Sequence, residues 1–184
     1  MRIVVTGTPG VGKHTIAKAL AERLRMSTID INELALSNNA VIGKDKFSYI
    51  VDTDKLRSTL KGLKDNTIVV GHLAPYVLDS NDVDLVVVLR RSPYELREIY
   101  KERRYDESKA KDNLASEILG IITYDSVKQF KGKVVEIDCT SKDVDTVVDE
   151  ILRIVNKKQE GMLGYIDWLA LVVKNNDLRE FFDY

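Results

Sequence analysis

A glycine-rich stretch near the N-terminus contains the residues with the clearest chemical meaning. The segment VVTGTPGVGKHTIAKAL, residues 4–20, places Gly7, Gly12 and Lys13 at the spacing of a phosphate-binding loop between an apolar strand and a helix. The backbone N–H groups of such a loop form a concave anion site, and the lysine adds positive charge near the β- and γ-phosphates of a nucleotide. Lys13 is therefore a predicted catalytic residue. The predicted nucleotide-binding residues of the loop are Gly10, Val11, Gly12, Lys13, His14 and Thr15.

His14 departs from the usual pattern of these loops. In that pattern a Ser or Thr follows the lysine directly, and its hydroxyl reaches magnesium. Here the hydroxyl comes one residue later, at Thr15, about 100° further round the helix, where it is better placed for a phosphate than for the usual metal position. The departure is confined to metal coordination, because the backbone N–H of His14 still contributes to the loop. Its imidazole either faces solvent or, when protonated, contacts a phosphate.

The elements that must position this loop alternate along the chain. Helical patterns separate segments that are apolar nearly throughout, as expected for parallel strands covered on both faces. The alternation predicts an α/β fold, a doubly wound parallel five-stranded sheet, in a domain of residues 1–156 followed by a helical tail, residues 157–184. The predicted strands are residues 2–7, 27–31, 67–71, 84–89 and 133–139.

The composition excludes several classes of protein. A length of 184 residues fits one domain, and a net charge of −1 provides no overall basic field for nucleic acid. Cys139 is the single cysteine, so an internal disulfide framework is excluded and a reducing compartment is favoured. The first residues do not have the pattern of a secretory signal, and no stretch of about eighteen apolar residues could span a membrane. We therefore expect a soluble, cytoplasmic protein.

Four features of the sequence together resemble one family. They are GTPGVGK-x-T, VDTDKL at residues 51–56, a histidine after the third strand, and VVVLRRSPYELREIYKERRYDESKAKDN at residues 86–113. This combination, which covers roughly residues 1–155, is similar to the adenylate kinase isoenzyme 6 family. Those archaeal and eukaryotic nucleoside monophosphate kinases are linked to small-ribosomal-subunit assembly. The resemblance implies ATP and AMP as ligands (ATP + AMP ⇌ 2 ADP), some ATPase activity, Mg²⁺ bound mainly through ATP, and a role in ribosome biogenesis and rRNA processing.

The resemblance also assigns the second nucleotide and a lid. It places a short lid at residues 102–112, in a region where residues 90–111 hold eight basic and five acidic side chains. Arg103 is the predicted lid arginine, which binds ATP and acts in catalysis. The monophosphate is expected at residues 30–53, where the acids either cap the following helix or contact the substrate. The predicted monophosphate-binding residues are Asp30, Asn32, Asp52, Asp54 and, after the fourth strand, Arg90.

His72 is the third predicted catalytic residue, because the family has a histidine at the end of this strand. The family often has an acid two residues earlier, where this chain has Val70. Together with His14, this departure removes two usual contributors to magnesium binding. We therefore expect magnesium to be held by nucleotide oxygens, Thr15 and water, since this ion normally keeps several waters.

Two further questions stay open in the sequence. One alternative function is an assembly factor in which nucleotide hydrolysis resets a contact with protein or RNA. A switch GTPase is disfavoured, because NKKQ at residues 156–159 lacks the Asp that recognises guanine.

The tail is apolar between residues 162 and 173, and such a segment needs a covering surface. It either packs on its own domain, packs on a second copy of the chain, or anchors a small-subunit ribosomal protein.

Overall fold

A parallel sheet forms the centre of the molecule. The structure, a computed structural model, describes residues 1–45 and 49–182. The strand order in the main sheet is β2-β5-β1-β6-β7, and every neighbouring pair is parallel. Each strand lies within one residue of a segment predicted from the sequence, so the doubly wound five-stranded sheet is confirmed. The strands are β1 (Arg2–Thr6), β2 (Ser27–Asp30), β5 (Thr67–Val70), β6 (Leu85–Arg90) and β7 (Val134–Asp138).

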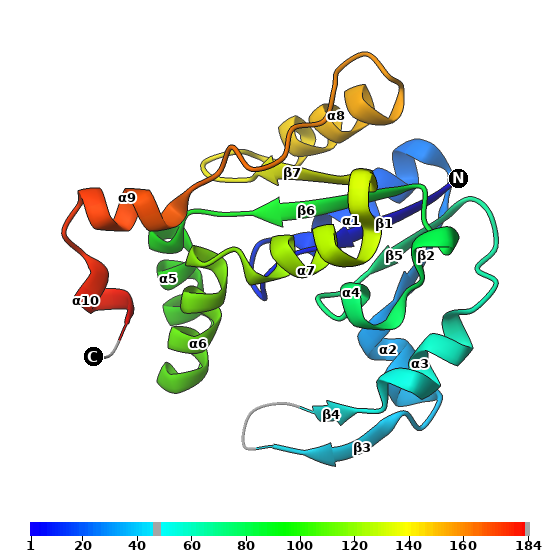
Figure 1. The fold of residues 1–184 in the computed structure, drawn as a ribbon, viewed down its shortest axis with the longest axis horizontal. Helices are drawn as coiled ribbons and strands as arrows, with labels where there is room; N and C mark the ends of the chain where they lie inside the picture. The colour runs from blue at the N-terminus through cyan, green and yellow to red at the C-terminus, as the bar shows by residue number, and fades with distance from the viewer. Residues whose placement is uncertain (46–48, 183–184) are drawn as a thin grey trace.

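Helices cover both faces of this sheet (Figure 1). Alternate residues of a strand enter different apolar clusters: Val87 and Leu89 of β6 pack with the helices α1, α5, α6 and α8, whereas Val86 and Val88 pack with α2, α3, α4 and α7. Apolar residues on both faces are what a buried parallel strand requires. The helices of these two layers are α1 (Lys13–Leu24), α2 (Ile31–Ser37), α3 (Thr53–Leu60), α4 (Ala74–Val77), α5 (Pro93–Glu102), α6 (Glu107–Ile118), α7 (Ile121–Phe130) and α8 (Val144–Val155), with single 3-10 turns η1 (Ser80–Asp82) and η2 (Lys131–Lys133).

A small hairpin interrupts the alternation after β2. Strands β3 (Val41–Lys44) and β4 (Tyr49–Val51) pair antiparallel, and they project from the α2 and α3 side of the molecule, away from the main sheet (Figure 1). The hairpin lies inside the region predicted to receive a monophosphate, of which residues 46–48 fall outside the described residues. No hairpin was predicted from the sequence in this region.

The predicted lid is a turn between two helices. Residues 102–112 comprise the end of α5, a four-residue link and the start of α6. Arg103 is the C-cap of α5, and Arg104 turns the chain with a left-handed φ of 53°. Helix α6 begins in the lid and ends in the core, where its Leu114 and Ile118 are buried.

The C-terminal segment returns across the domain. After α8 the chain passes along β7, where the Glu136 N–H donates to the Met162 carbonyl at 2.8 Å. It then forms α9 (Trp168–Lys174) and α10 (Leu178–Phe181), which lie beside α5 and α6 (Figure 1). Val172 and Phe181 are buried in the core cluster of α1, α5 and α8. The tail thus packs on its own domain, the first of the three alternatives; its last two residues, 183 and 184, lie outside the described part.

Within residues 1–45 and 49–182, no helix has both the length and the apolar character needed to cross a bilayer.

Candidate active site

The glycine loop has a backbone that only glycine adopts readily. Gly7 and Gly10 have φ values of 139° and 92°, in the region that side chains disfavour. A Cβ on Gly7 would lie 2.4 Å from the Leu89 carbonyl oxygen, and one on Gly10 would lie 2.7 Å from the Tyr100 ring. Gly12, with φ 102°, is the N-cap of α1, so the loop ends at the N–H groups of a twelve-residue helix. This is the geometry of an anion site.

Lys13 is a buried cation at the start of α1. Its side chain is nearly inaccessible, and its Nζ lies 3.4 Å from the Thr8 carbonyl oxygen. Burial lowers the pKa of Lys13 to about 8, with Asp30 acting in the opposite direction and Arg103 lowering it further. A phosphate at the loop would favour the charged form, so the site is electrostatically prepared for an anion.

Two side chains from distant helices hold the loop. The Thr8 hydroxyl donates to Glu117 Oε2 at 2.6 Å, and the Tyr100 hydroxyl donates to the Pro9 carbonyl. Tyr100 belongs to α5 and Glu117 to α6. Neither residue was predicted to belong to the site, because each occupies an ordinary position of an amphipathic helix.

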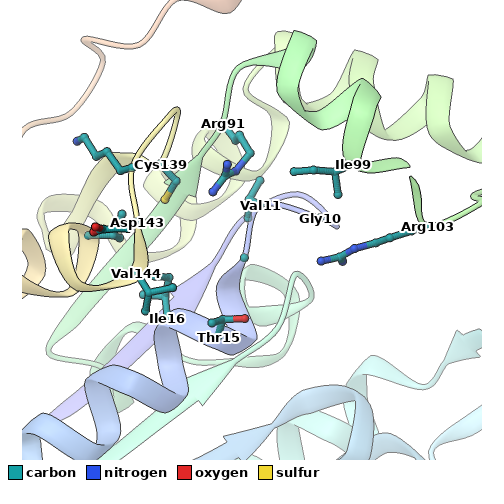
Figure 2. A pocket seen from close by; sticks show the side chains of 13 residues that line it. Gly10, Val11, Thr15, Ile16, Arg91, Ile99, Arg103, Cys139, Asp143 and Val144 are labelled. Atoms are coloured by element: carbon teal, nitrogen blue, oxygen red, sulfur yellow. The ribbon is translucent and has the colours of Figure 1, made fainter. Parts of the chain in front are cut away.

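A cavity of about 180 Å³ opens beside the loop (Figure 2). Arg103 points from the end of α5 toward the loop, and Arg91, Cys139 and Asp143 line the opposite part (Figure 2). The structure thus brings the predicted lid arginine to the loop. The other three residues were missed, although they follow β6 and β7 at the sheet edge where α/β ligands bind. The remaining lining residues are Gly10, Val11, Gly12, Thr15, Ile16, Ile99, Lys142, Val144 and Val147.

A second cavity, of about 420 Å³, lies between α2, the hairpin and the lid. Two predicted residues, Asn32 and His72, line it together with Lys109 of α6. Its apolar wall comes from α2, the hairpin and the start of α4: Ala35, Leu36, Val41, Tyr49, Val51 and Leu73. The region predicted to receive a monophosphate therefore faces a cavity of its own.

His72 lies within electrostatic range of Lys13 in the glycine loop. Burial lowers the pKa of His72 to about 4, and the positive charges of Lys13 and Lys109 act in the same direction. The imidazole is consequently neutral near pH 7, when it can donate or accept a hydrogen bond but cannot serve as a cation. His72 thus lines the second cavity and lies within electrostatic range of Lys13.

The side chain of His14 has a partner that the sequence analysis did not foresee. His14 Nε2 lies 2.8 Å from Asp30 Oδ2, while Asp30 Oδ1 accepts the N–H of Asn32 at 2.8 Å as the N-cap of α2. The imidazole is half-exposed and paired with Asp30, and its contact with a phosphate stays a prediction.

The two acids after the hairpin belong to the start of α3. Asp52 is its N-cap, accepting the Lys55 N–H at 2.9 Å, and Asp54 lies exposed in its first turn. The capping alternative is confirmed for Asp52, and contact of either acid with a monophosphate stays a prediction.

Arg90 is turned inward. Its Nε lies 2.8 Å from Glu117 Oε1 and its Nη1 lies 2.5 Å from Glu136 Oε1, and all three side chains are almost fully buried. Arg90 lines neither of the two cavities. The expectation that it faces a monophosphate is corrected by this placement, because two buried carboxylates neutralise the guanidinium and hold it away from the sheet edge.

The donor groups do not fit a magnesium ion held by the protein. Within the described residues, no group of three His, Cys, Asp or Glu side chains could bind a metal ion. The Asp30 carboxylate already pairs with His14 and caps α2. The position two residues before His72, where the family often has an acid, is the buried Val70. The Thr15 hydroxyl, at the edge of the first cavity, is the remaining protein oxygen of the predicted set.

Comparison with known proteins places this site in a family. The family described as "AAA domain" matches residues 3–120. A protein of Methanocaldococcus jannaschii named "Putative adenylate kinase" is 36% identical over 100% of this chain and 97% of its own length. One of the same name from Thermococcus kodakarensis is 36% identical, covering 91% of this chain and 93% of its own. The chain belongs to this adenylate-kinase-like family. As a member it is a kinase-type phosphotransferase with a P-loop.

Solved structures of other kinases share the fold of this adenylate-kinase-like chain. A gluconokinase from Sinorhizobium meliloti superposes with a TM-score of 0.56 at 19% identity, covering 86% of this chain and 93% of its own. A deoxyadenosine kinase from M. mycoides also gives a TM-score of 0.56, at 17% identity, with 86% and 100% covered. At such low identity these likenesses concern the architecture, an α/β kinase fold.

Proposed function

We propose that this protein is a cytoplasmic adenylate kinase that transfers the γ-phosphoryl group of ATP to AMP, producing two ADP. The observation that supports this proposal is a pair of cavities, one beside the glycine loop and the other lined by His72, whose pKa responds to the charge of Lys13. The glycine loop and Arg103 line the first cavity, while Asn32 and His72 line the second, and Lys13 carries a charge felt at His72. A kinase for two nucleotides needs one site for the donor and one for the acceptor on either side of the transferred group.

Phosphoryl transfer requires these residues to position the phosphates and to supply positive charge. Negative charge is spread over the transferring phosphoryl group, so the loop N–H groups, Lys13 and Arg103 would stabilise it electrostatically. The attacking phosphate of a monophosphate is already ionised at neutral pH. A neutral His72 therefore suits orientation of the acceptor by hydrogen bonding.

We propose that magnesium is bound mainly by the phosphates of ATP and by water. When bound, this ion neutralises charge on the phosphates. Thr15 is the protein oxygen expected to assist, because the side chains of His14 and Asp30 are paired with each other.

A coupled assay of ADP formation tests the proposal. ATP consumption should rise with AMP and saturate, with two ADP formed for each AMP consumed. Because the base preference of the acceptor is open, GMP, CMP and UMP serve as comparisons at the same concentration. The substitution Asn32→Ala in the second cavity should raise the KM for AMP more than that for ATP. ADP formation that no monophosphate accelerates would contradict the proposal.

That contrary result would favour the second candidate, a nucleotide-hydrolysing factor in small-ribosomal-subunit assembly. One observation favours a partner surface: Met162, Leu163, Leu169 and Val173 of the tail remain 38–51% exposed although the tail is docked. Replacing Leu163 and Val173 by Ser should then abolish co-purification of a small-subunit ribosomal protein and leave AMP-dependent turnover intact. Copurification that survives both substitutions would contradict this role of the tail.

A further inference from the structure

Glu117 joins three parts of the chain that are distant in sequence. Its Oε2 accepts the Thr8 hydroxyl of the glycine loop at 2.6 Å. Its Oε1 accepts Arg90 Nε at 2.8 Å, the Arg91 N–H at 3.1 Å and the indole N–H of Trp168 at 3.1 Å. The carboxylate is only 1% exposed. Both of its oxygens are thus fixed by protein donors, one on the loop side and one on the tail side.

The tail supplies two of the donors that this buried acidic cluster needs. Glu117 and Glu136 share a single buried arginine, Arg90, so the ion pairs alone leave one carboxylate charge in excess. A buried carboxylate is stable only with further hydrogen bonds. Besides the indole of Trp168, the Gly164 N–H donates to Glu136 Oε2 at 2.7 Å.

The docking of the tail has independent anchors at its far end. The Tyr94 hydroxyl donates to Asp177 at 2.7 Å, and Arg97 forms an ion pair with Glu180 at 2.6 Å. Phe181 is buried edge-on against the Tyr94 ring. Loss of the indole N–H would therefore leave most of the docking in place and remove one specific connection, the one to Glu117.

We infer that Trp168 is a positioning residue for the phosphate loop, acting through Glu117 on Thr8, so that docking of the C-terminal segment and nucleotide binding are coupled. Without the indole donor, Glu117 Oε1 keeps only the donors of Arg90 and Arg91. The carboxylate then shifts toward them, which weakens its hydrogen bond with the Thr8 hydroxyl. Coupling of this kind is reciprocal, so bound nucleotide strengthens tail docking by the same factor that the docked tail strengthens nucleotide binding. The inference rests on ATP binding at the loop, as proposed above.

The first experiment uses the wild-type chain. Calorimetry establishes ATP binding, and hydrogen exchange then compares the amides of residues 160–182 with and without saturating ATP. Exchange in this segment should slow on binding, although the segment lines neither cavity. No ATP binding would overturn the proposed function and this inference with it. Binding without any change in exchange would overturn the inference alone.

The second experiment is a double-mutant cycle. Trp168→Phe retains an aromatic ring without the donor, and Thr8→Val removes the loop hydroxyl at nearly the same volume. Each should raise the Kd for ATP about three- to tenfold, which lies within the range of couplings in one hydrogen-bond network. The double variant should be little weaker than either single one. Leu169→Ala, an exposed neighbour on the same helix, serves as the control with unchanged Kd.

A merely structural role of Trp168 predicts a different pattern. Trp168→Phe would then lower the Tm with an unchanged Kd for ATP, or its effect would add to that of Thr8→Val. Either result would overturn the inference. If Trp168→Phe does not fold, the exchange experiment on the wild-type chain decides.

Discussion

His14 Nε2 lies 2.8 Å from Asp30 Oδ2, and this contact ties the first turn of α1 to the start of α2. In the usual phosphate-binding loop, the residue directly after the lysine is a Ser or Thr, and its hydroxyl binds magnesium. Here that position carries an imidazole, and the imidazole also occupies the carboxylate that lies nearest to it. The residue after the loop lysine therefore offers no oxygen donor to a metal ion, and it also pairs with one oxygen of Asp30.

The variant His14→Thr should therefore lower the magnesium concentration needed for ATP binding. It restores a hydroxyl at the usual position and releases Asp30 Oδ2. Calorimetric titration with ATP at increasing magnesium measures this directly, and His14→Ala, which releases Asp30 without adding a hydroxyl, separates the two causes. Equal magnesium dependence in all three proteins would contradict the explanation.

Lys13→Ala should reduce turnover about 10²–10³-fold, the usual loss when one electrostatic contact to a transition state is removed. The fold should survive, because the deleted charge is a buried one whose desolvation already disfavours it. Lys18→Ala, at an exposed position of the same helix, is the matched control and should be neutral. Wild-type rates for Lys13→Ala would exclude the loop as the active site.

ATP affinity should weaken as the pH rises through about 8. Burial holds the pKa of Lys13 near this value, so the free protein loses the loop cation above it, well below the 10.5 of an ordinary lysine. Binding isotherms at pH 7, 8 and 9 with saturating magnesium test the prediction, since the bound ion keeps the γ-phosphate of ATP deprotonated across that range. Affinity that is constant from pH 7 to 9 would show that Lys13 keeps its proton.

Arg103→Ala should lower the rate of AMP-dependent transfer more than it weakens ATP binding. A lid arginine acts most strongly while charge moves between the two nucleotides, which lowers kcat when the side chain is absent. Lys101→Ala removes an exposed charge two residues earlier, near the end of α5, and should change neither quantity. A variant with weaker ATP binding and unchanged kcat would make Arg103 a simple binding residue.

Deleting residues 160–184 should destabilise the domain by about 3 kcal/mol or more, because buried Val172 and Phe181 leave the core and the cost of one lost phenylalanine is already of this size. Denaturant unfolding measures the change. A gentler pair checks the cause: Val172→Ala should destabilise, whereas Val173→Ala, at a 49% exposed position, should not. A truncated chain as stable as the full one would show that docking contributes nothing.

Much of the fold could be predicted from local patterns. The five parallel strands are short apolar runs whose character does not depend on distant residues, and each was found within one residue of its predicted bounds. The glycine loop was equally predictable, since Gly7, Gly10, Gly12 and Lys13 all lie between residues 7 and 13 and form one local backbone conformation. The hairpin β3–β4 was not predicted, because its two strands are very short and it is defined by their antiparallel pairing rather than by a local pattern.

The remainder of the site depends on contacts between residues far apart in sequence. Arg90 follows a strand at the sheet edge, and its sequence position suggests a ligand; Glu117 and Glu136, 27 and 46 residues later, turn it inward instead. His14 likewise pairs with Asp30, and the Thr8 hydroxyl donates to Glu117, which is 109 residues away in the sequence. Local patterns of residues were enough to predict the strands, the phosphate loop and the apolar tail. The ion pairs could not be predicted in this way, because the pairing of a buried charge depends on distances in space and on burial, and local spacing encodes neither quantity.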